Sequence, residues 1–193
     1  MKRIVALSLA AILAVSAPVL AQEGALTPEA MQEAMMKAAT PGEHHQHLAK
    51  LAGDFTYTAK AWMAPGAPPQ EWTGNRSAKM ILGGRFLEEH FDGSFAGMPF
   101  EGRGLFAYDN AAGHYTYLWC DNMGTMVTTS TGTCSEAGWE MKGTHRIPGT
   151  NAENAFRNVL RMVDDNTVVF EWHEAMPGGG EPFKMIEITY KRK

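Results

Sequence analysis

From Phe55 to the C-terminus, turn-forming residues interrupt the chain at short and nearly even intervals, and this spacing constrains the fold more than any other feature. Clusters of Gly, Pro, Asn and Asp separate segments in which apolar and polar residues alternate, as they do in half-buried strands. The expected strands are 54–63, 71–82, 85–92, 99–109, 113–120, 125–135, 138–146, 155–163, 167–174 and 182–191. Strands without intervening helices predict an all-β antiparallel meander of about ten strands, closed as a barrel or stacked as a sandwich.

The segments on either side of Asp164 predict which side chains face the core. A turn at 164–166 pairs even-numbered residues with even-numbered residues. The even set is apolar and comprises Phe156, Leu160, Met162, Val168, Phe170 and Trp172. The odd set holds charged residues and comprises Arg157, Arg161, Glu171 and His173. One face is therefore expected in the core and the other in water, as antiparallel sheets prefer.

The N-terminus has the three regions of a secretory signal peptide. Lys2 and Arg3 precede an apolar stretch over 4–15, and small residues at 19–21 predict cleavage between Ala21 and Gln22. The apolar stretch is too short to span a bilayer. We therefore expect residues 1–21 to be a signal peptide and the mature protein to be periplasmic or secreted.

The rest of the chain is expected to contain a helical segment and linker over 22–43 and one β domain over 44–193. Signal removal takes two of the 17 basic residues and none of the 21 acidic ones, so the mature chain carries a net charge of about −6. This balance argues against nucleic acid and anionic membranes as partners. We expect no membrane insertion after signal cleavage.

Two short helices are expected before the first strand. The first has Thr27 as its cap and Pro28 at its first position. Its stripe of Met31, Ala34, Met35 and Ala38 has helical spacing and is interpreted as core-facing. The second helix is expected to begin at Thr40, with Glu43 completing a capping box. One face of the second helix carries His44, His47, Leu48 and Leu51.

The two cysteines are expected to remain free thiols. The residues 121–124 predict a turn, which would place Cys120 opposite about Thr125 and roughly 30 Å along the strand from Cys134. A disulfide requires Cα atoms within about 7 Å.

Ordered motifs along most of the chain, from Thr40 to Lys193, resemble the bacterial DUF1579 proteins. They are Leu48-x-x-Leu51-x-Gly53-x-Phe55, Leu82-Gly83-Gly84-Arg85-Phe86-Leu87, Gly97-Met98-Pro99-Phe100-Glu101-Gly102 with Tyr108-Asp109, Trp119-x-Asp121 and Tyr190-Lys191-Arg192. The resemblance implies a lipocalin-like (calycin) barrel, and it implies no activity because the function of that family is unknown. In lipocalins a basic residue of the last strand covers an early aromatic ring. By that analogy Arg192 or Lys191 is expected to cover Phe55.

No motif recommends an enzyme or a cofactor. The chain lacks Gly-x-Ser-x-Gly, and Glu88 and Glu89 lie on opposite faces of one strand. His44 and His47 are weak candidates for metal binding, since they share a helix face but lack further ligands nearby. A polar helix face at the barrel end is the interpretation that we prefer for them.

Aromatic and polar residues on the inward face are the remaining candidates. Trp119, Trp139, Met141, His145, Phe170 and Trp172 are expected to line a ligand pocket or to pack in the core. The hypothesis is an exported protein that binds a small apolar or amphipathic molecule, with His145 as the polar contact. The alternatives are a haem- or metal-binding calycin with His145 or another inward-facing histidine as ligand, and a non-catalytic interaction protein of the cell envelope.

Overall fold

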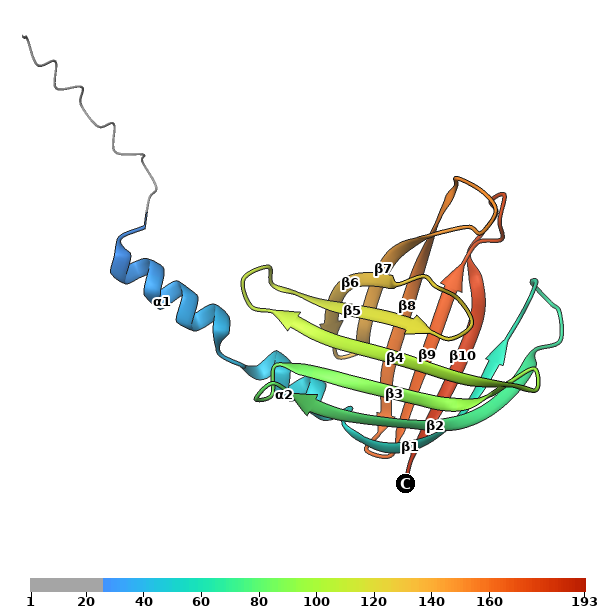
Figure 1. Ribbon diagram of the computed structural model, residues 1–193, viewed down its shortest axis with the longest axis horizontal. Coiled ribbons are helices and arrows are strands. Elements are labelled where there is room, and N and C mark those ends of the chain that lie inside the picture. Colours follow the sequence, from blue (N-terminus) through green and yellow to red (C-terminus); the bar gives the residue numbers. More distant parts are fainter. Residues whose placement is uncertain (1–25) are drawn as a thin grey trace, which may run out of the picture.

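A computed structural model describes residues 26–193, which form two helices followed by ten strands (Figure 1). The predicted signal peptide, residues 1–21, lies outside the described residues. The helices are α1 (Pro28–Ala39) and α2 (Glu43–Ala49). The strands are β1 (Gly53–Ala61), β2 (Gln70–Ile81), β3 (Phe86–Phe95), β4 (Met98–Asp109), β5 (His114–Asp121), β6 (Thr128–Ser135), β7 (Gly138–Arg146), β8 (Glu153–Asp164), β9 (Thr167–Glu174) and β10 (Phe183–Arg192). Every predicted strand is present, with ends that differ by three residues or fewer.

The sheet is a closed antiparallel barrel in which each strand pairs with its neighbours in sequence and β1 also pairs with β10. The meander is therefore confirmed, and of the two architectures left open by the residues the chain adopts the barrel. The register across β8 and β9 is also as predicted, because Leu160 lies opposite Phe170 and Arg161 opposite Val169. Even-numbered residues of these strands consequently face the interior.

The connection between β5 and β6 differs from the prediction. Trp119 pairs with Thr128, so a loop over 122–127 replaces the predicted turn at 121–124. Cys120 is thereby placed next to the start of β6, about 23 Å along the strand from Cys134 at ~3.3 Å per residue. Cys134 packs against the core and Cys120 lies on the opposite face of the sheet. Both thiols are free, as expected.

The interpretation of the α1 methionine stripe as core is wrong. Met31 and Met35 are 49% and 65% exposed, and every residue of α1 is at least partly exposed. The barrel instead holds the C-terminal end of α1 by its carbonyl groups. The Asn110 side chain donates to the carbonyl oxygens of Ala38 and Thr40 at 3.1 and 2.8 Å. Capping of the helix end, rather than side-chain packing, therefore attaches α1 to the barrel.

The start of α2 also differs from the prediction. Gly42 is the N-cap, whereas Thr40 caps the end of α1. His45, rather than Glu43, completes the cap, because the Gly42 N–H donates to its Nδ1 at 3.0 Å. Burial, together with the neighbouring charge of His44, lowers the pKa of His45. The neutral imidazole that the cap needs is thereby favoured.

One end of the barrel, which we call the closed end, is packed beneath α2. Leu48, Leu51 and Leu87 are fully buried there, together with Phe55. The Arg192 guanidinium lies 4.5 Å from the centre of the Phe55 ring and donates to the carbonyl oxygens of two residues before β1. The expected cover of the early aromatic ring by the last strand is therefore present, and Arg192 provides it.

An ion pair lies inside the barrel near the closed end. Arg76 and Glu89 are 4% and 6% exposed, and the Arg76 Nε donates to Glu89 Oε1 at 2.7 Å. Arg76 also donates to the Leu51 carbonyl oxygen at 3.0 Å. Burial raises the pKa of the neighbouring Tyr117 phenol well above its usual value, and the charge of Glu89 adds to this effect. Tyr117 is thus a neutral neighbour of the pair.

Candidate ligand site at the open end of the barrel

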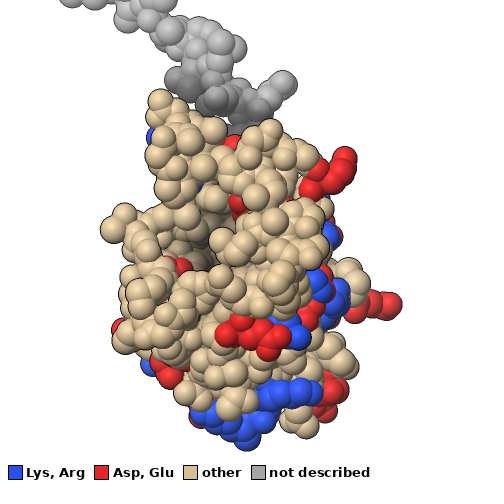
Figure 2. Space-filling model, turned by 90° about the vertical axis from the view of Figure 1, so that its right-hand side faces the viewer, with Lys and Arg blue, Asp and Glu red and all other residues tan. Residues whose placement is uncertain are grey.

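The barrel end opposite α2, which we call the open end, is surrounded by five loops. They are 62–69, 96–97, 122–127, 147–152 and 175–182. Figure 2 looks at this end and shows a hollow bordered mainly by uncharged residues, with most of the visible Lys, Arg, Asp and Glu side chains to its right and below it. The side chains that point inward near this hollow define the candidate site.

A buried carboxylate, Glu174, is the centre of a polar cluster at the open end. Glu174 is the last residue of β9 and is 7% exposed. Its Oε1 accepts a hydrogen bond from Asn154 Nδ2 at 2.8 Å and lies 3.0 Å from His145 Nε2. Its Oε2 accepts a hydrogen bond from the Trp172 indole N–H at 2.7 Å. Three strands, β7, β8 and β9, therefore supply donors to one inward-facing carboxylate.

Aromatic rings lie beside this cluster. Phe156 and Trp172 stack with their ring centres 4.0 Å apart, and the His145 ring is about equally far from both, at 6.1 and 6.2 Å. Gly143 makes room for the stack, because a Cβ atom there would collide with the Phe156 ring. The site thus combines an apolar wall with a compact polar group, which is the composition of small-molecule pockets.

The candidate residues from the sequence all lie on the inner face, but at different depths. His145 and Trp172 belong to the cluster, and Trp119 is near the same end on β5. Trp119 packs edge-on against Phe91 and donates its indole N–H to Asp121 at 2.8 Å. The structure therefore divides the predicted set into two groups.

The other three candidates lie further inside. Trp139 and Met141 are each 4% exposed, and Phe170 lies between Leu160 and Ile188 in the sheet. Trp139 contacts Phe106 and Tyr115, with ring centres 6.0 and 6.2 Å away. These positions are those of core residues beneath the site.

Sequence reasoning missed Glu174, Asn154 and Phe156 as site residues. All three are even-numbered and lie on the strands whose even face was predicted to be inward. A buried acidic residue at the end of an otherwise apolar face was the signal that could have identified Glu174, because an unpaired carboxylate is costly to bury.

The two histidines proposed as weak metal ligands participate in packing at the closed end. The His44 ring stacks on Tyr108 at 3.8 Å, and its Nδ1 is 3.0 Å from the Tyr115 hydroxyl. The His47 ring is 6.2 Å from His44, edge to face. Within residues 26–193, His, Cys, Asp and Glu side chains form no group of three that could hold a metal ion.

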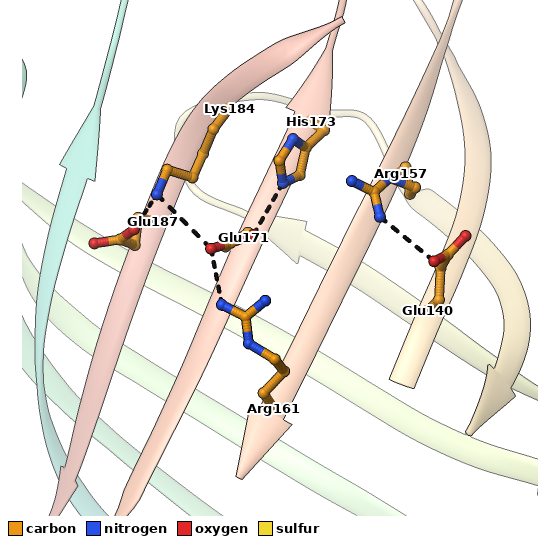
Figure 3. Close-up of polar contacts among 7 residues, drawn as sticks. All are labelled: Glu140, Arg157, Arg161, Glu171, His173, Lys184 and Glu187. Carbon is orange, nitrogen blue, oxygen red and sulfur yellow. Dashed lines mark hydrogen bonds and ion pairs between the residues drawn. The ribbon is translucent and has the colours of Figure 1, made fainter. Parts of the chain in front are cut away.

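The outer face of the same strands carries a charged network (Figure 3). Glu171 accepts a hydrogen bond from Arg161 at 2.9 Å and pairs with His173 at 3.0 Å and with Lys184 at 3.7 Å. Burial acts to raise the pKa of Glu171, but the hydrogen bonds from His173 and Arg161 outweigh it, so the pKa is lowered. Glu171 and Glu174, three residues apart, thus lie on opposite faces with different partners.

Two hollows lie outside the barrel wall. A groove of about 770 Å³ runs over the outer faces of β6 to β9, and a second of about 800 Å³ lies between α1 and Tyr108. The cations of the first groove, Lys142 and Arg157, both pair with Glu140. Because those charges are already matched, the inner cluster is the stronger candidate for a ligand site.

The fold defines a class of protein, the closed antiparallel β-barrel with meander topology. The family model for DUF1579, described as a protein of unknown function, matches residues 40–192, and the chain belongs to this family.

Among solved structures, that of Rv2717c from M. tuberculosis has the same fold, with a TM-score of 0.58 and 14% sequence identity. The match covers 80% of this chain and 99% of that one. No curated protein matches the sequence. No helix among residues 26–193 is long and apolar enough to cross a membrane.

Proposed function

We propose that this protein is exported and binds a small amphipathic molecule at the open end of its barrel. The observation that carries the proposal is the buried Glu174 carboxylate, held by His145, Asn154 and Trp172 beside the Phe156–Trp172 stack. The apolar part of the ligand would lie against the rings and its head group beside the polar cluster.

The chemistry of the cluster favours an uncharged head group such as a hydroxyl or an amide. The Asn154 and Trp172 donors are already directed at Glu174, so they are not free to bind an anion. An anionic head group would also be repelled by the buried carboxylate, since charges interact strongly where water is scarce.

Equilibrium titration with a fluorescent amphiphile tests the proposal. The probe is an uncharged naphthalene dye with a twelve-carbon acyl chain, and we expect saturable binding that Trp172→Ala and His145→Ala weaken about tenfold or more. His173→Ala is the matched control, because His173 follows Trp172 in β9 but points outward into the Glu171 network. Absence of saturable binding to the native chain, or equal losses in His145→Ala and His173→Ala, contradicts the proposal.

The haem or metal alternative rests on the same histidine. A carboxylate that accepts a hydrogen bond from the ring orients many metal-bound histidines, and Glu174 could do so for His145. The Nδ1 of His145, however, lies 3.3 Å from the Arg146 carbonyl oxygen, so the ring would have to turn to bind a metal there. Visible absorbance of the protein purified from its own envelope, lost in His145→Ala, would favour this alternative.

A further inference from the structure

The loops at the open end are almost free of charge. Four of the five, 62–69, 96–97, 122–127 and 147–152, contain no Asp, Glu, Lys or Arg, and the fifth contains only Glu181. In the whole chain 20% of residues are charged. Short turns at the closed end do carry charges, for example Arg85, Glu136 and Asp165. The lack of charge is therefore a property of one end of the barrel and not of loops in general.

The same loops expose large apolar side chains. We call these residues the apolar rim: Met63 (62% exposed), Met98 (49%), Met123 (44%), Met126 (45%) and Val127 (56%). They come from three separate loops or strand ends that converge on one end of the barrel. Contiguous exposed apolar surface on a soluble domain marks a site of interaction. The uncharged border of the hollow in Figure 2 is this end of the molecule.

We infer that the apolar rim docks on an uncharged or zwitterionic lipid surface, with the barrel opening against it. The inference rests on the proposed function, because the rim lies at the same end of the barrel as the candidate site. An amphipathic molecule partitions into bilayers, and a docked opening would let it pass into the barrel without exposing its apolar part to water. The contact is peripheral, and no segment of the chain needs to cross the bilayer.

The chemistry of the rim favours lipid over a protein partner. Protein interfaces combine an apolar centre with a charged or polar border that fixes the orientation of the partner. The four uncharged loops offer no such ionic contacts, whereas loop tips with unbranched methionine side chains can adapt to a fluid surface. Trp62, half-buried at the base of the first loop, has the ring type that concentrates at membrane interfaces.

The charge of the protein favours a zwitterionic surface in particular. The full sequence has a net charge of −4 and loses two further positive charges with residues 1–21, so an anionic leaflet repels the protein. Anchoring by basic clusters is the usual route to anionic membranes, and the loops at the open end contain no basic residue. Apolar burial is then the driving force that remains for this end of the barrel.

Flotation with phosphatidylcholine vesicles tests the inference on the full chain after signal removal. The rim variant is Met63→Ser, Met123→Ser and Met126→Ser combined, and we expect its partition coefficient to fall at least about tenfold, in line with the loss of buried apolar area. The matched control combines Met31→Ser, Met35→Ser and Met36→Ser, since these α1 methionines are 49–65% exposed. The control is expected to bind vesicles as the native chain does, and thermal melting verifies that both variants fold.

Each of several outcomes overturns the inference: no vesicle binding by the native chain, equal losses in both triple variants, or binding that requires anionic lipid. A rim-dependent dimer in light scattering would assign the rim to a second copy of the chain instead. Titration with the uncharged dye in the absence of vesicles separates this result from the proposed function. Dye binding without vesicle binding refutes only the docking, whereas vesicle binding without dye binding refutes the ligand site.

Discussion

The two ends of the barrel bury charge in different ways. Near the closed end, Glu89 is paired with the guanidinium of Arg76, which also donates to a backbone carbonyl and lies 4.9 Å from the centre of the Phe55 ring. At the open end, Glu174 is held by the neutral donors Asn154 and Trp172 and by a histidine. The first carboxylate is balanced by a permanent cation, and the second is not.

The two carboxylates also differ in what covers their end of the barrel. Helix α2 and fully buried side chains cover the closed end, whereas loops with few charges border the open end. A buried charge that is fully paired and covered from water can affect the stability of the fold, but it has no contact with a ligand. A carboxylate that lacks a permanent cation and lies next to a hollow can also respond to a ligand. We therefore expect substitutions at the closed end to change stability and those at the open end to change binding.

The largest difference is expected when the same substitution is made in both carboxylates. Glu89→Gln leaves Arg76 buried without its counterion and is expected to cost about 3–5 kcal/mol of unfolding free energy. Glu174→Gln retains one acceptor oxygen for its donors and is expected to cost about 1–2 kcal/mol. Urea denaturation measures both, and similar costs for the two variants would contradict the comparison. Arg76→Met combined with Glu89→Leu should recover most of the loss.

Tryptophan truncation is expected to give the next largest contrast. Trp139→Ala removes a ring that is 4% exposed and should cost about 3–5 kcal/mol. Trp172→Ala removes a half-buried ring at the open end and should cost less, about 1–2 kcal/mol, while dye binding is lost. Thermal or urea unfolding combined with dye titration measures both effects. If Trp139→Ala abolished dye binding at little cost in stability, the ligand would lie deeper than we propose.

The period of two and the spacing of the turns were sufficient to predict the strands and their inward faces. The alternation of apolar and polar residues determines the pairing register of the strands, because a shift of one residue would bury Glu140 and Lys142 and expose Trp139. Closure into a barrel did not follow from the residues, since alternation is the same in a barrel and a sandwich, and the family resemblance supplied it. The cover of Phe55 by Arg192 or Lys191 was likewise predicted by this resemblance alone, and the structure shows that Arg192 provides it.

The failures have identifiable causes. The Met31–Met35 stripe has the period of a packed helix, but the period does not specify a partner, and Asn110 attaches α1 by its end instead. The β5–β6 turn was misplaced because Asn122 and Gly124 are turn formers inside a longer loop. The Glu174 cluster was missed because its partners come from three strands, and hydrogen-bond geometry across strands cannot be read from one segment.

Removal of Arg192 is expected to weaken the closed end by a smaller amount. Arg192→Ala loses the stacking on Phe55 and hydrogen bonds to the carbonyl oxygens of Lys50, Ala52 and Asp165, so we expect a cost of about 2 kcal/mol. Lys191→Ala is the matched control on the other face, where one hydrogen bond to Thr167 is lost, and it should cost about 0.5–1 kcal/mol. Dye binding at the open end should be unchanged in both. A change in binding for Arg192→Ala would show that the two ends are coupled.

The smallest expected effect is a pH dependence at the closed end. The pKa of His45 is lowered in the fold, first by burial and then by the charge of His44, so the folded state binds a proton at His45 less readily than the unfolded state. The stabilisation by the neutral ring is therefore complete above the unfolded pKa of about 6.5 and is lost as pH falls through the folded pKa. Protonation at Nδ1 also removes the acceptor for the Gly42 N–H, and loss of a helix cap costs about 1 kcal/mol.

The measurement is the unfolding free energy of the native chain and of His45→Gln between pH 8 and pH 5. We expect the advantage of the native chain over the variant to shrink toward pH 5, and an advantage that stays constant over this range would show that the neutral His45 cap does not contribute to stability.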